Sequence, residues 1–427
     1  MAFLVSSSLS FLRRGRLDRY YSRICRVSFS DDSKGSQVMQ ASYQEYSEAQ
    51  YSAHTGCQDM LLQSIQRWGH RIQMEDELLM NAHQNVARQL RMADLGSADG
   101  SNSIQTLSVV MESLKEYRDL SSHSLDIVLE EHPDSDEKHL NETLNRHEQL
   151  FQKYNARYRT LIKSFYEPLF PPNSMDFVMS HLCLHWLDTA DKKHNVGNWK
   201  GLHRQLGQST GLDEESDDNS FVFVNEKCAP PLLKEVWRKE LAMRHLANFL
   251  MLRATELRPG AELFLMMVGE GHEFVCPDSD DDDESSLLTI AMKKCVEGGT
   301  LREEVLTNTI VPYYLRNAND IYDAVDLMNS TVDSNTGPFL QVVDLQYYTA
   351  NTGVDIDRAC ELFWSIHQGA VIGFGNATNE ECEALKSALA LEFKTAYSPE
   401  IGIMGKFVAC VLRKRSRKPW PQGPASR

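Results

Sequence analysis

The sequence lacks several features that would assign it to a common class. It has no CxxC pair and no regular cysteine spacing, so its nine cysteines signal neither a disulfide framework nor a zinc site. No apolar run approaches the roughly 20 residues of a membrane-spanning helix. Basic residues are too few to balance the acids, and a formal charge of -16 argues against binding to nucleic acid, whose phosphates would be repelled. We therefore expect a soluble protein with a small diffusible substrate.

What the sequence does contain is the composition of an ordinary globular enzyme. With 427 residues, 42% of them hydrophobic, the chain can bury a full core, and one large domain with an insertion fits its length. The first thirty residues differ, because they hold a single acid, Asp18, and six arginines: Arg13, Arg14, Arg16, Arg19, Arg23 and Arg26. We expect residues 1–32 to be either a transit peptide, for a mitochondrion or plastid, or a disordered basic tail of a cytoplasmic protein.

Apolar periodicity indicates strands that alternate with helices. Residues 91–103, RMADLGSADGSNS, have the pattern of a short strand, a glycine turn and the start of a helix. A second strand at 124–129 ends in Glu130 and Glu131, and a helical stretch is expected over 138–162. A long helix is expected at 232–257, and further strands at 175–182, 261–271, 339–347 and 406–414. This order is typical of an α/β fold with a mostly parallel sheet.

Two segments break this alternation: residues 187–225, rich in Gly, Asn and Asp, and residues 276–335. We expect them to form loops and an α-helical cap on a core made of residues 43–186, 226–275 and 336–415, followed by a disordered tail at 416–427. The second segment carries the acidic run DSDDDDE, residues 278–284. Such a run is usually a solvated loop, and cation binding there is the alternative.

The turn after the first strand is a candidate cofactor site. In ADLGSADG, Asp94 closes the strand, and Gly96 and Gly100 flank a turn into a helix, as in sheets that bind nucleotide-like ligands at their carboxyl edge. Glu131 ends the next strand, where an acid can accept hydrogen bonds from both ribose hydroxyls. The turn lacks the G-x-G-x-x-G spacing of dinucleotide enzymes, which favours S-adenosylmethionine. Glycine turns also occur between strands and helices without a ligand, and Glu131 is then a solvated acid.

Several segments resemble, in order, those of the plant SABATH methyltransferases, which methylate the carboxylates of small acids or ring nitrogens of xanthines. The similarity covers about residues 43–415. YSAHTGCQ (51–58) is similar to the family's Y-A-x-N-S-x-x-Q, and ADLGSADGSN (93–102) to its A-D-L-G-C-S-S-G-P-N. The most specific match is SFYEPLFPPNSMDFVMSHLCLHWLD (164–188), and NFLMLRATELRPGAELFLMMVG (248–269) is another.

This resemblance implies a methyltransferase of the Rossmann-like class I fold, with seven mostly parallel strands, a helical cap and S-adenosylmethionine as cofactor. The implied cofactor-binding residues are Tyr51, Thr55, Gln58, Asp94, Gly96, Asn102, Glu131, Ser164 and Phe165. The implied substrate-binding residues are Gln58, Leu182, His185 and Trp186. The family also implies a homodimer, and a requirement for magnesium stays open.

Gln58 and Trp186 match the two family residues that hold the substrate carboxylate. A side-chain amide and an indole are neutral N–H donors, so they can bind a carboxylate oxygen without a counter-charge that would weaken the nucleophile. A carboxylic acid is ionised near neutral pH, so methyl transfer needs only alignment with the sulfonium methyl group and no general base. We therefore expect no catalytic acid or base, and a product that is the methyl ester of a small, mostly apolar acid.

The chain departs from the family pattern at several positions. HPDSDEK replaces a P-x-N-D-F-N stretch after the second strand, Leu182 replaces a tyrosine of the substrate site, and Gln368-Gly369 replaces a Glu-Pro pair. Because of these changes, the resemblance does not identify the acid that is methylated. Two alternatives therefore stand: methylation of a ring nitrogen in the same fold, and a non-catalytic relative that binds the cofactor or an acid.

Overall fold

The computed structural model describes residues 53–81, 88–118, 123–188, 221–226, 229, 231–271, 285–332, 338–351, 355–397 and 404–415. The predicted leader, Tyr51, most of the segment 187–225, the acidic run 278–284 and the predicted tail 416–427 lie outside these residues.

Strands alternate with helices along the described chain, as the periodicity predicts. The strands are β1 (Arg88–Leu95), β2 (His123–Glu131), β3 (Ala156–Ile162), β4 (Met175–His181), β5 (Leu257–Val268), β6 (Phe339–Asn351) and β7 (Met404–Arg415). The helices are α4 (Gln58–Asn81), α5 (Ser101–Leu114), α6 (Glu137–Arg146), α7 (Glu148–Lys153), α9 (Pro231–Val236), the π-helical turn η3 (Trp237–Ala242), α10 (Met243–Glu256), α11 (Leu287–Glu297), α12 (Glu303–Asn308), α13 (Ala318–Thr331), α14 (Ile356–Gly373) and α15 (Asn379–Ala396). No helix of this set is long and apolar enough to cross a bilayer.

The strands form one seven-stranded sheet in the order β3-β2-β1-β4-β5-β7-β6, which confirms the predicted fold class. β1, β2, β3, β4 and β5 pair in parallel, whereas β7 is antiparallel to both of its neighbours. Helices cover both faces, so the inner strands are buried on both sides and their sequences are nearly continuous apolar runs. The run LFLMMV in β5 is one of these.

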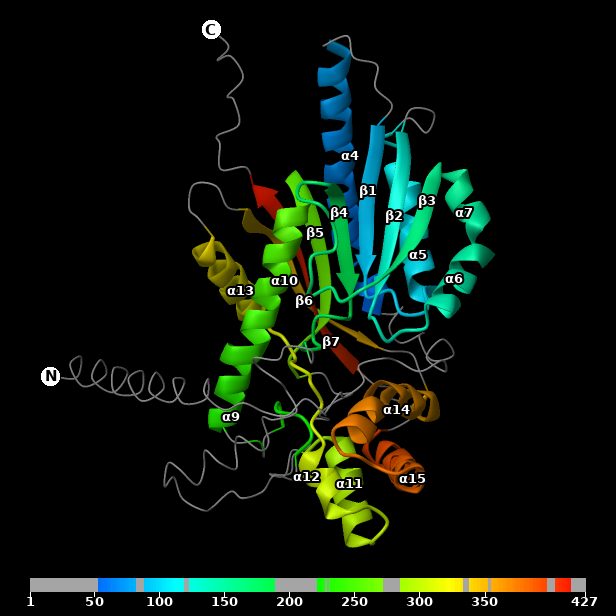
Figure 1. Ribbon diagram of the computed structural model, residues 1–427, viewed down its shortest axis with the longest axis vertical. Helices are drawn as coiled ribbons and strands as arrows, with labels where there is room; N and C mark the ends of the chain where they lie inside the picture. The colour runs from blue at the N-terminus through cyan, green and yellow to red at the C-terminus, as the bar shows by residue number, and fades with distance from the viewer. Residues whose placement is uncertain are drawn as a thin grey trace, which may run out of the picture.

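Side chains of one strand alternate between two hydrophobic cores on opposite faces of the sheet. In β5, Phe264 and Met266 belong to the core that contains residues of α4 and α5. Leu263 and Leu265 point the other way, into the core shared with α10 and α13. Figure 1 shows α10 and α13 in front of the sheet and α4 behind it. The sheet is thus the middle layer of three.

A group of helices lies beyond the carboxyl ends of the parallel strands. Figure 1 shows the arrowheads of β1 and β4 directed toward α11, α12, α14 and α15, which lie below the sheet in that view. α11 packs against α15, and α14 against α15. We call these four helices the cap. Parallel strands bring the ends of β1, β2 and β4 to one edge, so the candidate site lies at the edge of the sheet that faces the cap.

The helical stretch predicted over 138–162 is wrong in its last third. After α6 and α7, Asn155 adopts a left-handed backbone conformation with φ of 46°, and β3 follows. Its residues pair in parallel with β2, from Leu125 opposite Ala156 to Glu131 opposite Ile162. β3 is an edge strand whose arginines keep much of it exposed, so its apolar signal is weak and the pairing with β2 decides its conformation.

The cap also differs from its predicted composition. Of the segment 276–335, α11 and α12 lie in the cap, but α13 packs on α10 and β6 and covers the sheet. Conversely, α14 and α15 lie in the cap although the prediction puts them in the core. All of these helices are amphipathic, and an apolar stripe does not identify the surface that will cover it.

One buried arginine ties the segment after β3 to α10. Arg253 is fully buried and donates to the carbonyl oxygens of Phe165 and Glu167, each at 2.9 Å, and to Glu256 Oε1 at 2.9 Å. The same Glu256 oxygen accepts the backbone N–H groups of Leu169 and Phe170 at 2.7 and 3.1 Å. Arg253 therefore fixes the position of Phe165, a predicted cofactor residue.

We expect Arg253→Met to lower the free energy of unfolding by about 3–5 kcal/mol, because it leaves the Glu256 carboxylate buried without its cation. Urea denaturation followed by circular dichroism measures this. The matched control is Arg244→Met on the same helix, where the arginine is 53% exposed and pairs with Glu240. That control should change the free energy by about 0.5 kcal/mol or less. Equal losses in the two variants would contradict the structural role of Arg253.

Candidate cofactor and substrate site

The turn between β1 and α5 is fixed by the end of β2. The N–H group of Gly96 donates to the backbone oxygen of Glu130 and to its carboxyl Oε2, both at 3.0 Å, and the N–H group of Ser97 donates to the same backbone oxygen at 2.9 Å. Gly96 and Gly100 have φ of 77° and 82°, a region that glycine adopts without strain. A Cβ atom on Gly96 would lie 2.2 Å from Cys183 Sγ. The turn therefore requires glycine at 96 for two independent reasons.

Glu130 contributes a buried carboxyl group to this edge. Its side chain is inaccessible to solvent, and Oε1 has no hydrogen-bond partner among the described residues. Burial, and to a lesser extent the neighbouring Glu131, raise the pKa of Glu130 well above its usual range. A buried polar atom without a partner is rare in native proteins, which marks this edge as a place for a ligand or water.

Glu131, the predicted ribose acid, points back at the glycine turn. It is the last residue of β2, and its Oε2 accepts the N–H group of Ala98. Its Oε1 accepts the N–H group of His132 at 2.9 Å and the hydroxyl of Ser135 at 3.0 Å. Burial raises its pKa. A carboxylate oxygen has two lone-pair positions, so Oε2 can accept one further donor.

Asp94 lies beside His181, which packs against His54, and the sequence did not single out either histidine. Asp94 is 3% exposed, and its Oδ1 is 3.9 Å from Nδ1 of His181, the last residue of β4. The His181 ring packs on His54, with 4.5 Å between the ring centroids. Burial, followed by the influence of His181, lowers the pKa of His54 well below its usual value. A signal for His181 was present in the sequence, because it ends a strand at the carboxyl edge.

Ser164 and Phe165, the predicted adenine neighbours, follow β3 and lie close to the turn. The Phe165 ring approaches the Cβ position of Gly96 to 4.0 Å and packs edge-on against Phe249. The Ser164 hydroxyl accepts the N–H group of Tyr166 at 3.2 Å. Asn102 is half-buried in the first turn of α5. Asp94, Gly96, Asn102, Glu131 and Phe165 therefore lie around one turn, and their binding of a cofactor stays a prediction.

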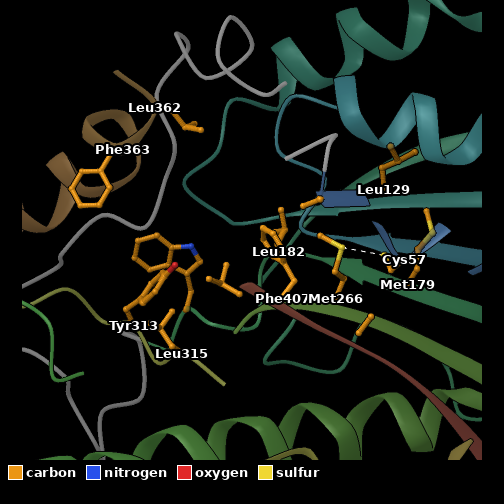
Figure 2. Close-up of a cluster of buried hydrophobic side chains, with 14 of the residues drawn as sticks. Cys57, Leu129, Met179, Leu182, Met266, Tyr313, Leu315, Leu362, Phe363 and Phe407 are labelled. Carbon is orange, nitrogen blue, oxygen red and sulfur yellow. Dashed lines mark hydrogen bonds between the residues drawn. The ribbon is translucent and has the colours of Figure 1, made fainter. Parts of the chain in front are cut away.

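Gln58 begins α4 near the ends of β4 and β5. The Sγ atom of Cys57 donates to Met266 Sδ at 3.3 Å, and the N–H group of Leu182 donates to the backbone oxygen of Met266 at 2.7 Å. Figure 2 shows Cys57, Met266 and Leu182 side by side. Gln58 is half-buried, and its amide makes no hydrogen bond within the described part of the chain. Thr55, one turn earlier, is exposed.

Trp186 packs between the edge of the sheet and the cap. It forms an isolated β-bridge with Tyr313, and its ring meets the Tyr313 ring edge-on at 5.3 Å. His185 packs against the same tyrosine at 4.5 Å. Trp186 is only 8% exposed, and its indole N–H makes no hydrogen bond to a described residue.

Trp186 belongs to an aromatic cluster that the cap completes. The ring contacts that define it connect His185, Trp186, Phe223, Tyr313, Phe363 and His367. Figure 2 shows Tyr313 and Phe363 at one end of the apolar side chains, with Leu182 between them and Cys57. Gln58 and Trp186 lie at the same edge but make no hydrogen bond to each other. The binding of one substrate carboxylate by both side chains therefore stays a prediction.

His367 is the member of this cluster that the sequence did not reveal. It lies on α14, is 2% exposed, and its Nδ1 is 2.7 Å from the backbone oxygen of Phe363. Burial lowers its pKa to about 4, so the ring is neutral at pH 7. Nε2 has no partner among the described residues. Nothing in the sequence distinguishes a histidine on the face of a helix that meets a substrate from one in a core.

Metal ligands are not grouped in the described residues. No cluster of three or more His, Cys, Asp or Glu side chains is placed there to hold an ion. The acidic run 278–284, where cation binding was the alternative, lies outside the described residues.

The strand order, the glycine turn after β1 and the acid at the end of β2 are those of the class I methyltransferase fold. A model of the SAM-dependent carboxyl methyltransferases matches residues 33–332, and the chain therefore belongs to this family, the SABATH methyltransferases. The resemblance found in the sequence is confirmed, and S-adenosylmethionine is the cofactor.

Individual relatives agree with this membership. The chain is 26% identical over 249 residues to a protein named probable caffeine synthase from Coffea canephora, and 25% identical over 261 residues to 3,7-dimethylxanthine N-methyltransferase 2 from Coffea arabica. These alignments cover 56% and 58% of this chain, and the chain spans only 59% and 62% of the length of the two relatives. A solved structure of loganic acid methyltransferase with SAH has the same fold, with a TM-score of 0.64 at 15% identity, covering 90% of this chain and 99% of that one.

The residues at the strand ends fit this cofactor. Gly96 keeps the turn free of a side chain, Glu131 retains an acceptor position on Oε2, and the Glu130 Oε1 atom lacks a partner among the residues that the structure describes. Phe165 offers an apolar ring beside the turn. The site thus combines acceptors for hydroxyl and ammonium groups with a surface for a planar base.

We expect Gly96→Ala to weaken binding of S-adenosylhomocysteine on the order of tenfold or more, because Cys183 must move and displace the turn. Isothermal titration calorimetry measures the affinity. The matched control is Gly299→Ala, where φ is 70° and no atom of a described residue lies within 4 Å of the added Cβ. It has the same backbone strain without the collision, so its affinity should equal that of the wild type. Equal losses in both variants would show that the collision at Gly96 is unimportant.

A second expectation concerns the stability of the protein in acid. The pKa of His367 is about 4 in the folded protein and near 6.5 in the unfolded chain, so the unfolded chain binds the proton first as the pH falls. The free energy of unfolding should therefore decrease between pH 6.5 and pH 4, by up to about 3 kcal/mol from this group.

His367→Phe removes this contribution, so its stability should fall less steeply below pH 6.5 than that of the wild type. Urea denaturation at pH 7, 6 and 5 tests this. His147→Phe is the control, since His147 makes the same contact with the carbonyl four residues earlier, at 2.9 Å to Thr143, but is exposed. Parallel pH dependences for wild type and His367→Phe would contradict a neutral buried imidazole.

Proposed function

We propose that the protein transfers a methyl group to the carboxylate of a small, mostly apolar acid and releases the methyl ester with S-adenosylhomocysteine. The observation that carries this proposal is the pair of neutral donors at the carboxyl edge of the sheet. Gln58 is half-buried at the start of α4, and Trp186 is 8% exposed and follows β4, so both side chains lie at this edge. Both can donate to an anionic oxygen.

The surroundings of Trp186 suit an apolar acid. Tyr313, Phe223 and Leu182 supply apolar surface, and His367 is neutral at pH 7. Neutral donors hold a carboxylate without pairing its charge, so the oxygen keeps its nucleophilicity. Burial of the reacting groups excludes water, which favours a reaction in which a sulfonium and a carboxylate lose their opposite charges.

When bound, S-adenosylmethionine supplies the electrophilic methyl group. The Gly96 turn, Glu131 and Phe165 place the cofactor at the strand ends, and Trp186 with Gln58 orients the carboxylate toward it. No side chain has to remove a proton, because the acid is already ionised at neutral pH. Orientation is then the main contribution of the protein.

Methylation of a ring nitrogen is the second candidate. It is favoured by the relatives from Coffea, one of which is named a 3,7-dimethylxanthine N-methyltransferase. A xanthine would also fit an aromatic cluster, and its ring N–H and carbonyl groups would need neutral polar partners.

Incubation with radiolabelled S-adenosylmethionine distinguishes the two candidates. We expect labelled methyl ester from at least one member of a panel of aromatic, indole and fatty acids, and none from 7-methylxanthine or 3,7-dimethylxanthine. Label transferred to a xanthine but to no acid would establish the second candidate. Label in neither an acid nor a xanthine would favour the remaining alternative, a non-catalytic protein that binds the cofactor or an acid.

With the best acid, Trp186→Phe should lower kcat/KM by roughly 10- to 100-fold, because a hydrogen bond to a charged oxygen is lost while the ring remains. The matched control is Trp68→Phe. Trp68 stacks on Phe177 with 5.4 Å between centroids, and its buried indole N–H has no partner among the described residues, so no hydrogen bond is lost. Unchanged kcat/KM in Trp186→Phe would contradict a hydrogen bond from the indole N–H group to the substrate.

A further inference from the structure

His367 presents a buried hydrogen-bond acceptor to the aromatic cluster. Its Nδ1 faces the backbone oxygen of Phe363 at 2.7 Å, and a carbonyl oxygen can only accept. Nδ1 therefore carries the proton. Since the ring is neutral at pH 7, Nε2 holds a lone pair and no hydrogen.

This lone pair has no donor within the described protein. The rings around His367 are Trp186 at 6.2 Å, Phe223 at 5.3 Å, Tyr313 at 6.1 Å and Phe363 at 4.2 Å between centroids. A polar atom that is buried without a hydrogen bond destabilises the folded state, and native structures rarely retain one without a ligand or an ordered water to satisfy it.

The position of His367 relates it to the substrate and not to the cofactor. Trp186, which contacts His367 through its ring, is the proposed carboxylate-binding residue, whereas the glycine turn contacts Phe165 and Cys183. A small ring that places its carboxylate at Trp186 would direct its remaining edge toward the other members of the aromatic cluster. Among these members, Phe223 and Phe363 have no polar atoms in their side chains.

We propose that His367 Nε2 accepts a hydrogen bond from a hydroxyl or ring N–H group of the substrate, and so selects substrates that carry such a donor away from the methylated atom. The inference rests on the proposed placement of the substrate beside Trp186. It narrows the substrate class to hydroxylated or N–H-bearing ring compounds. A compound of the same shape without the donor leaves Nε2 unpaired and binds more weakly.

Binding to pairs of compounds tests the proposal without requiring turnover. The hydroxy pairs are benzoate against 2-, 3- and 4-hydroxybenzoate, and the N–H pair is caffeine against 3,7-dimethylxanthine. Dissociation constants are measured by calorimetry with saturating S-adenosylhomocysteine. Wild type should bind at least one donor-bearing member about tenfold more tightly than its partner, which is the effect of one net hydrogen bond.

In His367→Phe, which keeps a ring of similar size, this preference should disappear while the affinity for the donor-free partner stays within about twofold or rises. His147→Phe is the control and should keep the wild-type preference, because His147 is exposed and outside the aromatic cluster. The affinity for S-adenosylhomocysteine reports that each variant is folded. An equal preference in wild type and His367→Phe, or no preference in wild type, would overturn the proposal.

A second measurement uses only the wild-type protein, in case His367→Phe does not fold. In protein labelled with ¹⁵N-histidine, the His367 Nε2 resonance should move on addition of the preferred donor-bearing compound and stay in place with its donor-free partner. A resonance that responds identically to both would also overturn the proposal.

Ester formation measured in parallel separates the two claims. If the preference depends on His367 but no ester is formed from any acid, the acceptor role is correct and carboxyl methylation is wrong. If esters are formed equally from benzoate and its hydroxylated partners by wild type and His367→Phe, carboxyl methylation is correct and the acceptor role is wrong.

Discussion

The whole site depends on the close packing of the Gly96 turn against the ends of β2 and β4. Two N–H groups of this turn are bound by the backbone and carboxyl group of Glu130, and Cys183 fills the space where a side chain at 96 would lie. Because β1, β2 and β4 are parallel, their carboxyl ends meet here and the turn is held from two sides. This constraint aligns Asp94, Glu131 and the start of α5.

Two chemically different halves meet at this edge of the sheet. The half near β2 is acidic and polar, and its carboxyl groups suit the amino-acid and ribose parts of S-adenosylmethionine. The half toward the cap is aromatic, with neutral polar atoms at Trp186 and His367. The edge of the sheet contributes the polar half and Trp186. Helix α14 of the cap contributes His367 and Phe363 to the aromatic half. With the substrate placed beside Trp186 as proposed, the packing of the cap on the sheet determines which substrates the methyl group can reach.

The sequence predicts the parts of this arrangement that local pattern determines. Apolar runs identify β4 and β5, and the glycine spacing identifies the turn at Gly96. β3 is missed because its exposed arginines obscure the alternation and only pairing with β2 makes it a strand. α14 is assigned to the wrong layer, and His367 is missed with it, because its surroundings include the rings of Trp186, Phe223 and Tyr313 from three distant segments.

A crystal structure of the protein with S-adenosylhomocysteine tests the central claim most directly. The account predicts ribose hydroxyls within hydrogen-bond distance of Glu131, the adenine beside Phe165, and the sulfur atom facing the aromatic cluster at Trp186. S-adenosylhomocysteine bound with its ribose away from Glu131, or with its sulfur directed away from Trp186, would contradict it.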